Sequence, residues 1–356
     1  MIFLPDLTLE ELQKEVNPTF RAKQIYQWVF QKFAASFDEM SNLPKTLREE
    51  LSKKFTLTSM KIIRKEESAD GSIKYLFQLH DGHTVEGVLL KMRDVELHED
   101  GGIAREAQYT ICLSTQVGCK VGCAFCLTAK GGFVRNLTPG EIVSQVLLIK
   151  KDQGFRPEKR LNLVYMGMGE PLDNLENVSK AIRIFATDSG LEIAPRRQTI
   201  STSGISSRID KLGEMDLGVQ LAISLHAVDD TTRETLIPMN KAFPIQSIID
   251  AVKRFPVDTR KRVMFEYLVI KDLNDSLEAA KTLLKLLEGI KAKVNLIYFN
   301  PYEGSPFQRP EKEKMIAFQE YLHKRGITCT IRESKGIDIS AACGQLRERE
   351  GSACST

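Results

Sequence analysis

Residues 111–126 read ICLSTQVGCKVGCAFC, and this stretch decides how the rest of the chain is interpreted. Its first residues, Ile111–Ser114, form a short run typical of a strand. Its second half holds Cys119, Cys123 and Cys126 in a C-x3-C-x2-C spacing. Clustered thiols of this kind indicate a metal or redox site more than a structural disulfide framework.

Closely spaced cysteines are compatible with three kinds of structure. Positions i, i+4 and i+7 share one face of a helix, so the thiols could be small core residues. Against that, Gly118 and Gly122 interrupt the segment, and no apolar stripe continues upstream. Structural zinc usually takes four ligands as two separated pairs, and no second pair accompanies this group. Three thiolates suit an iron–sulfur cluster that leaves one iron open for a substrate.

The rest of the chain indicates an α/β core. Its 356 residues are 42% hydrophobic and 27% charged, enough for one large core with or without a small appended domain. Strand candidates alternate with helical stretches from Thr110 onward: Ile111–Ser114, Leu161–Met166, Gln198–Ser201, Gln220–Leu225, Arg262–Val269 and Val294–Phe299. This alternation predicts a parallel sheet with both faces covered, as an open doubly wound sheet or as a full or partial barrel.

The N-terminal part follows a different pattern. Residues 1–58 have helical periodicity, and short alternating runs at Met60–Arg64, Ile73–Leu79 and Val85–Lys91 predict a small sheet. We therefore expect a helical accessory domain (1–58), a small β-sheet connector (59–104), an α/β core (105–342) and a C-terminal segment (343–356) that ends in a flexible tail.

Charge and hydropathy limit the partners. The net charge of +3 permits nucleic-acid binding without requiring it. Basic groups at 196–197 and 260–262 could meet phosphates or belong to an ordinary solvated face. No apolar run approaches the roughly 20 residues of a membrane-spanning helix, and the N-terminus lacks the basic start of a signal peptide. We expect a cytoplasmic monomer without membrane contact.

The C-x3-C-x2-C loop after the first core strand, with Phe125 between its last two cysteines, resembles the radical S-adenosylmethionine (SAM) superfamily. The resemblance implies a partial (β/α)6 TIM-like barrel, here with a helical N-terminal accessory domain and a small β extension. It also implies one [4Fe–4S] cluster held by Cys119, Cys123 and Cys126. The open iron of that cluster would chelate the amino and carboxylate groups of SAM.

Five further segments narrow the resemblance to RNA methyltransferases that act on carbon 2 of adenine. They are CLSTQVG (112–118), MGMGEP (166–171), STSG (201–204), SLH (224–226) and DISAACGQL (338–346). On their own, residues 167–171 could be an ordinary βα turn, and His226 could be a buried core histidine. The resemblance implies SAM contacts, all at ends of predicted strands, at Gly169, Glu170, Ser201, Ser224, Leu225, His226 and Asn300.

The same resemblance implies the catalytic residues and two SAM molecules per turnover. Cys343 would take a methyl group from one SAM, and a 5′-deoxyadenosyl radical from the second would activate that methyl for addition to the base. Glu86 would accept a proton, and Cys112 would release the product through a transient disulfide with Cys343. Without the resemblance, Cys343 is typical of a small buried residue and Glu86 of the solvent face of a strand. Cys329 is expected in the core, and Cys354 has no assigned role.

The implied substrates are adenosine 2503 in the peptidyl-transferase centre of free or protein-poor 23S ribosomal RNA, and adenosine 37 of transfer RNAs. The implied electron donor is flavodoxin or ferredoxin. A candidate RNA grip in the N-terminal domain comprises Arg21, Lys23, Lys32, Tyr26, Trp28 and Phe30, although Trp28 and Phe30 individually are more typical of core residues. Two rivals stay open: methylation at carbon 8 of the same adenosine, as in antibiotic-resistance relatives, and a zinc-holding RNA-binding protein without catalysis.

Overall fold

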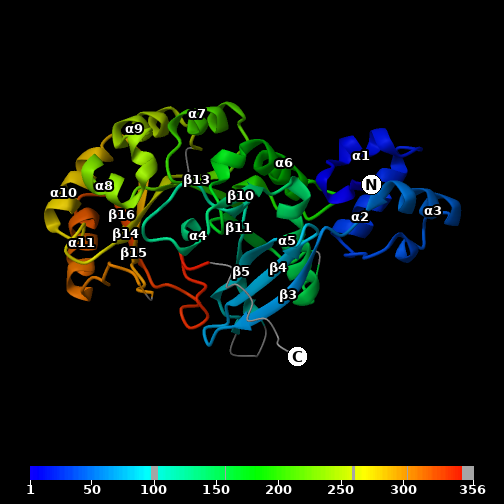
Figure 1. The fold of residues 1–356 in the computed structure, drawn as a ribbon, viewed down its shortest axis with the longest axis horizontal. Helices are drawn as coiled ribbons and strands as arrows, with labels where there is room; N and C mark the ends of the chain where they lie inside the picture. The colour runs from blue at the N-terminus through cyan, green and yellow to red at the C-terminus, as the bar shows by residue number, and fades with distance from the viewer. Residues whose placement is uncertain (98–102, 157, 259–260, 303, 347–356) are drawn as a thin grey trace.

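Ten strands of the described chain form one curved sheet, and seven of them run parallel (Figure 1). The computed structural model describes residues 1–97, 103–156, 158–258, 261–302 and 304–346. The parallel strands, in sheet order, are β8 (Gln108–Cys112), β11 (Leu161–Tyr165), β12 (Gln198–Thr202), β13 (Gln220–Ser224), β14 (Val263–Val269), β15 (Ala292–Tyr298) and β16 (Thr328–Arg332). The predicted partial barrel is confirmed, and β16 extends the six expected strands by one.

Helices cover the outer face of the parallel strands, because each crossover between parallel neighbours must pass over a face of the sheet. They are α5 (Pro139–Asp152), α6 (Leu175–Ala186), α7 (Ser206–Glu214), α8 (Asp230–Leu236), α9 (Ile245–Arg254), α10 (Leu277–Leu286) and α11 (Lys312–His323). A reciprocal capping box starts α5: Thr138 Oγ1 accepts from Glu141 N (3.2 Å), and the Glu141 carboxylate accepts from Thr138 N (2.9 Å). Strand β12 is buried at every residue, as a strand covered on both faces should be.

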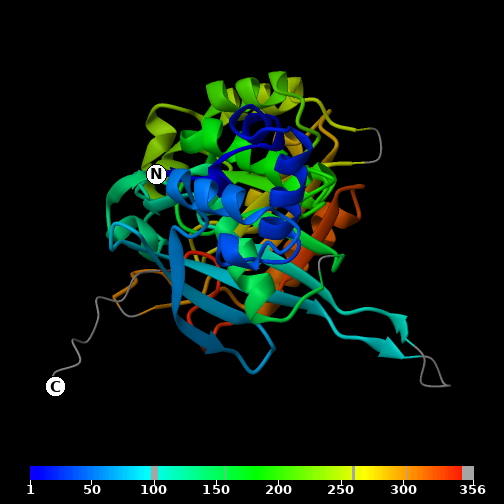
Figure 2. The same ribbon diagram turned by 90° about the vertical axis from the view of Figure 1, so that its right-hand side faces the viewer.

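The three strands that we predicted as a separate small sheet instead continue the barrel sheet. Strands β3 (Met60–Glu67), β4 (Ile73–Leu79) and β5 (Thr84–Arg93) are antiparallel, and β5 pairs with β8 so that Val88 lies opposite Cys112. The barrel does not close, and β5 covers the edge that β8 would otherwise leave unpaired. Strands β6 (Glu96–Leu97) and β7 (Ile103–Arg105) form an arm that projects from the body (Figure 2).

The N-terminal residues form a helical lobe beside the barrel, with α1 (Leu9–Glu15), α2 (Phe20–Phe30) and α3 (Lys45–Lys54). Strand β1 (Ile2–Phe3) pairs with β2 (Phe55–Thr56). The lobe docks on the first turn of α5, where the Asp6 carboxylate accepts from Gly140 N at 2.7 Å. A Cβ atom on Gly140 would lie 2.5 Å from a ring carbon of Phe3, so this contact requires glycine. None of the described helices combines the length and the hydropathy needed to cross a bilayer.

Candidate active site

A cavity of about 310 Å³ opens inside the partial barrel at the carboxyl ends of the parallel strands, where barrel enzymes place their active sites. The wall on one side is formed by β5 and β8, and on the other by the segment after β16. The cavity gathers ten of the predicted site residues: Cys112, Cys119, Cys123, Cys126, Gly169, Glu170, Ser201, Ser224, His226 and Cys343. Residues from five separate segments of sequence therefore meet in one place.

Three predicted site residues do not line this cavity. Leu225 is fully buried, and its main chain acts instead: its carbonyl accepts from Arg233 Nε at 3.0 Å. Asn300 follows β15, where its amide donates to Ser334 Oγ (2.6 Å) and accepts from Arg309 (2.9 Å). Glu86 lies in the wall behind the cavity.

The three clustered cysteines occupy an irregular loop between β9 (Gln116–Gly118) and α4 (Leu127–Lys130), so the alternative of a helical core stripe is wrong. Strand β9 pairs with β10 (Phe133–Asn136), which folds the loop back on itself. Gly118 has φ 74°, and a Cβ atom there would lie 2.0 Å from the Gly132 carbonyl oxygen. Only glycine permits this close approach of two backbones.

The loop cysteines fit an iron–sulfur cluster better than a single metal ion. Burial raises the pKa of Cys119 to about 12, and burial together with Cys126 and Cys119 raises the pKa of Cys123 well above its usual value. Thiols in such surroundings ionise readily only when a metal compensates the charge. Across the part of the chain that the structure describes, no three His, Cys, Asp or Glu side chains converge on one point as a zinc site requires. Cys119, Cys123 and Cys126 are the residues that would hold a [4Fe–4S] cluster, because cysteine thiolates are the usual protein ligands of such clusters.

Glu170 offers a buried carboxylate at the cavity wall. It accepts hydrogen bonds from Ser203 N (2.7 Å), Ser203 Oγ (2.8 Å) and Leu172 N (3.0 Å). Burial raises the pKa of Glu170, and the bonds from Ser203 oppose this effect. The neighbouring Gly169 has φ 102°, and a Cβ atom there would lie 2.6 Å from Gln116 Cβ. The contact between Gly169 and strand β9 therefore requires glycine, in addition to the predicted approach to a ligand.

His226 follows β13 as a buried residue with φ 59°, a conformation that non-glycine residues adopt at a cost of about 1–3 kcal/mol. Its Nδ1 accepts from Leu268 N at 3.0 Å, so the neutral ring carries its proton on Nε2. Burial and the nearby Arg233 lower the pKa of His226 to about 3. The ring also makes an edge contact with Phe125, with centroids 5.0 Å apart. His226 therefore lines the cavity as a neutral, oriented imidazole.

Cys343 lies on a strap, residues 336–346, that is fastened at both ends. At one end Gly336 N donates to Asp70 (2.9 Å), and Asp338 accepts from Ser68 Oγ (2.6 Å). At the other end, the Gly344 carbonyl accepts from the main chain of α4 (2.7 Å), and the Leu346 carbonyl accepts from a threonine hydroxyl of the same helix (2.6 Å). The strap thus holds the Cys343 thiol at the cavity next to the cysteine loop.

The two cysteines expected to act as a pair differ in exposure. Cys343 is exposed, whereas Cys112 is buried at the end of β8. Burial and, after it, Cys343 raise the pKa of Cys112, and both cysteines line the same cavity. All six cysteines of the described chain are free thiols, and Cys329 is buried in the core as predicted. Cys354 and the predicted tail (347–356) lie outside the described residues.

Glu86 is fully buried, so the alternative that it forms the solvent face of a strand is wrong. Its carboxylate lies 3.4 Å from Lys74 Nζ, which also pairs with Glu66 at 2.8 Å. Glu86 lies on the same face of β5 as Val88, a cavity residue, because alternate residues of a strand share a face. The carboxylate is therefore adjacent to the cavity without lining it.

Sequence reasoning missed several cavity residues, including Ser203, Glu266 and Arg332. Glu266 carried a usable signal, because it is a carboxylate inside the apolar run VMFEYLV of β14. A charged residue within a fully buried strand is costly and points to a functional position. Ser203 and Arg332 carried no comparable signal, since both types are common at strand ends.

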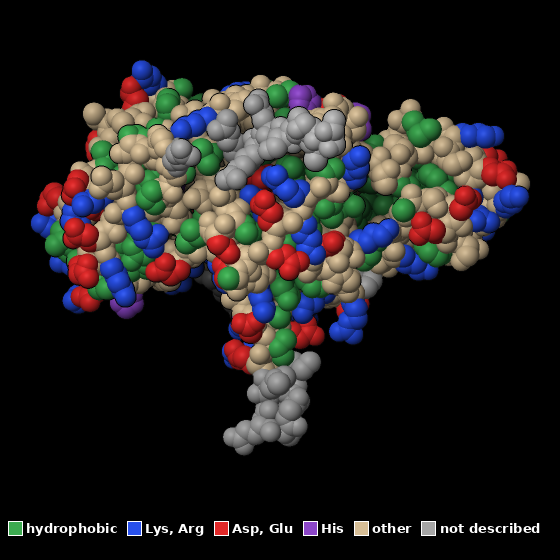
Figure 3. All heavy atoms as spheres, turned by 60° about the horizontal axis from the view of Figure 1, so that its bottom comes forward, with side chains coloured by type: hydrophobic (Ala, Val, Ile, Leu, Met, Phe, Trp, Pro, Cys, Tyr) green, Lys and Arg blue, Asp and Glu red, His purple; other side chains and the backbone are tan. Residues whose placement is uncertain are grey.

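The predicted RNA grip is only partly exposed. Tyr26 and Phe30 are fully buried, with ring centroids 4.2 Å apart, so they belong to the core of the lobe. Trp28 is half-buried and carries Lys32 Nζ 3.7 Å from its ring centroid, an arrangement typical of a cation–π contact. Lys and Arg alternate with Asp and Glu over the lobe and the barrel in Figure 3. The accessible candidates are therefore Arg21, Lys23, Lys32 and Trp28.

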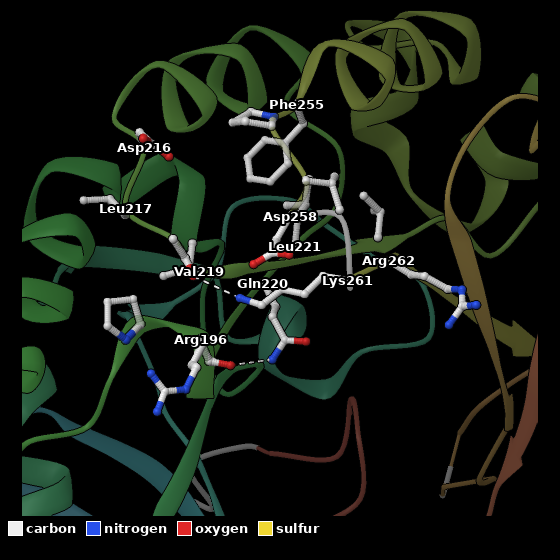
Figure 4. A pocket seen from close by; sticks show the side chains of 15 residues that line it. Arg196, Asp216, Leu217, Val219, Gln220, Leu221, Phe255, Asp258, Lys261 and Arg262 are labelled. Carbon is white, nitrogen blue, oxygen red and sulfur yellow. Dashed lines mark hydrogen bonds between the residues drawn. The ribbon is translucent and has the colours of Figure 1, made fainter.

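A second cavity of about 710 Å³ lies at the amino-terminal ends of β13 and β14, opposite the candidate site (Figure 4). It is lined by Arg196, Lys261 and Arg262, which include part of the predicted phosphate-binding groups, and by Asp216 and Asp258. The ammonium of the lining lysine donates to the Gly218 carbonyl at 3.3 Å. None of the predicted catalytic, cofactor or metal residues lines this cavity.

Comparison with known proteins gives the same assignment along the whole chain. Residues 113–286 match the radical SAM superfamily, and residues 4–57 match the ribosomal RNA large subunit methyltransferase N-terminal domain. Two proteins named dual-specificity RNA methyltransferase RlmN are 66% identical over 347 residues (Sulfurovum sp.; 98% of this chain, 97% of that protein) and 68% identical over 344 residues (Nitratiruptor sp.; 97% of each). A crystal structure of a radical SAM methyltransferase from Sphaerobacter thermophilus is 42% identical, with a TM-score of 0.88 over 98% of this chain and 99% of that one.

Proposed function

The chain belongs to the RlmN family of radical SAM RNA methyltransferases, and from this membership we propose that it methylates carbon 2 of adenosine in RNA. As a radical SAM enzyme it uses a [4Fe–4S] cluster and SAM. The proposed targets are adenosine 2503 of free or protein-poor 23S ribosomal RNA and adenosine 37 of transfer RNAs. The proposed compartment is the cytoplasm, where these RNAs and a flavodoxin or ferredoxin reductant would be met.

One observation carries the proposal: Cys112, Cys343 and the three loop cysteines line a single cavity. Carbon 2 of adenine lies between two ring nitrogens and is electron-poor, so it is a poor nucleophile toward a sulfonium methyl. Cys119, Cys123 and Cys126 would hold the cluster, and Glu170 would bind the amino group of SAM. When bound, the cluster and SAM supply a 5′-deoxyadenosyl radical, which makes addition to such a carbon feasible.

The chain's own residues carry and release the methyl group. Cys343, exposed at the cavity, would take the methyl group and present it to the base, while the strap fixes its position. Glu86 would accept the proton that leaves carbon 2. The Cys112 thiolate would then attack the Cys343 sulfur, forming an S–S bond as the bond from sulfur to the carbon on the base breaks. The released base takes up a proton and leaves with its new methyl group.

The substrate must be brought to a narrow cavity that stacked RNA cannot enter. Recognition is therefore expected in a loop, or with the target base extruded at a cost of a few kcal/mol. The N-terminal lobe is the proposed grip, because Lys32 and the half-exposed Trp28 offer charge and a stacking surface together. The Arg21 side chain lies on the same helix, where it donates to the Asn42 carbonyl.

The test is a methylation assay with the reconstituted enzyme under exclusion of oxygen. A 23S ribosomal RNA fragment and a transfer RNA transcript are each incubated with SAM and a reductant, digested to nucleosides and analysed by mass spectrometry. We expect 2-methyladenosine from both RNAs, whereas 8-methyladenosine would contradict the proposal. Full RNA methylation by a Cys343→Ala variant with an intact cluster would contradict the carrier role.

A further inference from the structure

Glu266 is a carboxylic acid buried in the floor of the cavity, with only 4% of its surface exposed. Its Oε1 accepts a hydrogen bond from Asn295 Nδ2 at 2.8 Å. The Asn295 Oδ1 in turn accepts from Thr330 Oγ1 at 2.7 Å. Three neighbouring strands, β14, β15 and β16, each contribute one residue to this row of side chains.

The row fixes how the Glu266 carboxyl is oriented. A hydroxyl donating to Asn295 Oδ1 leaves only the amide N–H groups to face Glu266, so Oε1 is held in place. The other oxygen, Oε2, is buried and has no hydrogen-bond partner among the described residues. A buried carboxyl oxygen without a partner is costly, and such groups in native structures require an explanation. In a residue that lines a reaction cavity, a transient partner in the cavity is that explanation.

Cys343 is the cavity residue that we assign as the transient partner of Glu266 Oε2. Glu266 and Cys343 line the same cavity. Although Cys343 is exposed as a residue, its thiol lies in the cavity, where burial and, after it, the Glu266 carboxyl raise the pKa of the thiol. Burial raises the pKa of Glu266 itself, which strengthens it as a base, while Asn295, Arg332 and Lys293 oppose that shift. Arg332 also lines the cavity and opposes the rise at Cys343.

The other two carboxylates of the cavity wall are worse placed for proton transfer. Glu170 is the proposed ligand of the SAM amino group, and its carboxylate already accepts three hydrogen bonds, one from Leu172 N and two from Ser203. Glu333 is exposed and lies near the Arg309 guanidinium, at 3.5 Å. Glu266 alone combines burial, a fixed orientation and an oxygen left for a partner.

We propose that Glu266 is the general base that takes the thiol proton of Cys343 when this cysteine accepts a methyl group from SAM. The inference rests on the proposed role of Cys343 as methyl carrier. The S–H bond breaks and its proton passes to the Glu266 carboxylate, while the new S–CH3 bond forms. The bond from the sulfonium sulfur to the methyl group breaks with its electron pair, leaving neutral S-adenosylhomocysteine. A carboxylate and a sulfonium cation are consumed together, so charge balances.

The experiment isolates the first methyl transfer. The chain is produced without its cluster, so that Cys343 starts unmethylated, then reconstituted without oxygen and mixed with SAM in the absence of RNA and reductant. Mass spectrometry of the peptide containing Cys343 follows methylation over time. Glu266→Gln retains an acceptor for Asn295 but cannot take a proton, and we expect its rate to fall by about 10²-fold or more. Glu266→Asp should recover part of the rate.

Two controls separate a base from a structural residue. Glu288→Gln removes an exposed carboxylate outside the cavity and should methylate Cys343 at the wild-type rate. The Glu266→Gln rate should rise with pH about tenfold per unit, because only the spontaneously formed thiolate reacts, whereas the wild-type rate should be far less dependent on pH. Bound iron and SAM affinity should match the wild type.

The methylation results distinguish a failure of the base role of Glu266 from a failure of the carrier role of Cys343. A wild-type enzyme that never methylates Cys343 would refute the carrier role itself. If the wild type methylates Cys343 and Glu266→Gln does so equally fast, the base assignment alone is wrong. Loss of SAM affinity with a normal rate at saturating SAM would also overturn it, because Glu266 would then be a SAM ligand. Should Glu266→Gln fold poorly, the rate and pH dependence of Glu266→Asp decide the question.

Discussion

Cys343 is the proposed methyl carrier and Cys112 the proposed attacking thiol, and the first is exposed whereas the second is buried. Removing each of them should therefore have a different consequence. A Cys112→Ala enzyme retains the carrier but lacks the attacking thiolate, so RNA should remain covalently bound to Cys343. We expect a protein–RNA adduct on a denaturing gel and a fall in multiple-turnover methylation of more than about 10²-fold. The double variant that also carries Cys343→Ala should form no adduct; an adduct there, or normal turnover by Cys112→Ala, would refute this division of roles.

The buried His226 predicts a dependence of stability on pH. Its pKa is about 3 in the folded chain and 6.5 ordinarily, so below pH 6.5 the unfolded chain binds more protons and stability falls as the pH falls. Between pH 7.5 and 5.5 this single residue should remove about 1.4 kcal/mol from the free energy of unfolding. Urea unfolding of the cluster-free chain should therefore show a smaller loss for His226→Gln than for the wild type, by that amount.

An exposed histidine provides the control for this measurement. His83→Gln, in the β4–β5 turn, removes an exposed histidine and is the matched variant for comparison. Equal pH dependence in His226→Gln and wild type would show that the histidine is not held neutral. The comparison uses differences between chains, so the buried carboxyls Glu170 and Glu266 contribute equally to each and cancel.

Among single residues, the sequence alone identified those whose spacing is itself the signal. Three cysteines in eight residues need no structure to be noticed, and the family resemblance supplied Cys112, Cys343 and Glu170. Glu266 was missed because its proposed role depends on the hydrogen bond from Asn295 to one of its two carboxyl oxygens. This bond joins two different strands, so it cannot be read from local sequence. The burial of Glu86 was missed because a single charged residue in an alternating strand gives no indication of what lies opposite.

Among the elements, the strap that carries Cys343 depends on a few polar contacts at its ends. Asp338 accepts from Ser68 Oγ and from Ala69 N (3.1 Å), and both bonds are formed at the turn between β3 and β4. Replacing Asp338 with Ala should release that end while leaving the barrel intact, because exposed hydrogen bonds contribute only about 1 kcal/mol each. We expect faster hydrogen exchange across residues 336–346, unchanged exchange in β12, and slower methylation of Cys343.

The hydrogen-exchange measurement on Asp338→Ala can also contradict the prediction. If exchange across residues 336–346 stays at the wild-type rate in Asp338→Ala, the contacts to α4 and the bond from Gly336 N to Asp70 are sufficient to hold the strap. A Glu288→Ala variant, at an exposed position far from the strap, controls for a general effect of removing a carboxylate.

Docking of the N-terminal lobe depends on Gly140 in the first turn of α5. Alanine normally stabilises a helix relative to glycine, yet here its Cβ atom would lie 2.5 Å from the Phe3 ring and 2.7 Å from Asp6 N. Gly140→Ala should therefore lower the free energy of unfolding by about 1–3 kcal/mol. The chain has one tryptophan, Trp28 in the lobe, so its fluorescence in urea should change before the far-UV signal of the barrel.

One result would contradict this prediction, and a second variant provides the reference. A stabilised Gly140→Ala chain would mean that Phe3 and the Asp6 backbone move aside at no cost. Lys253→Ala, at an exposed position of α9, should change the stability by no more than about 0.5 kcal/mol and serves as the reference.

The elements themselves were largely predictable, because hydrophobic periodicity and caps are local. The β4 bounds, Ile73–Leu79, agree with the predicted run. The continuity of β3–β5 with the barrel was not, because it depends on whether the parallel strands close into a ring. Closure is set by tilt and stagger over the whole sheet, which no local window contains.

For the whole molecule, the distribution of charge bears on how RNA is held. The net charge is only +3, and acidic and basic side chains are interspersed over the face seen in Figure 3. Such a surface does not attract RNA uniformly, so a small number of phosphate contacts must provide most of the electrostatic binding. Shape, stacking and the fit of the target base should then contribute a larger share of the binding free energy than they do in strongly basic RNA-binding proteins.

We therefore expect the affinity for RNA to depend only weakly on salt concentration. Each phosphate contact contributes about −0.7 to −0.9 to the slope of log affinity against log salt concentration. Neutralising Arg21, Lys23 and Lys32 together should therefore reduce the slope for transfer RNA by about 2 to 3, measured by fluorescence anisotropy. The matched control neutralises three basic residues at the opposite end of the barrel, Arg196, Lys261 and Arg262, and should leave the slope unchanged. A flattened slope in the control variant, with a wild-type slope in the lobe variant, would place the RNA at the amino-terminal end of the barrel, far from Cys343.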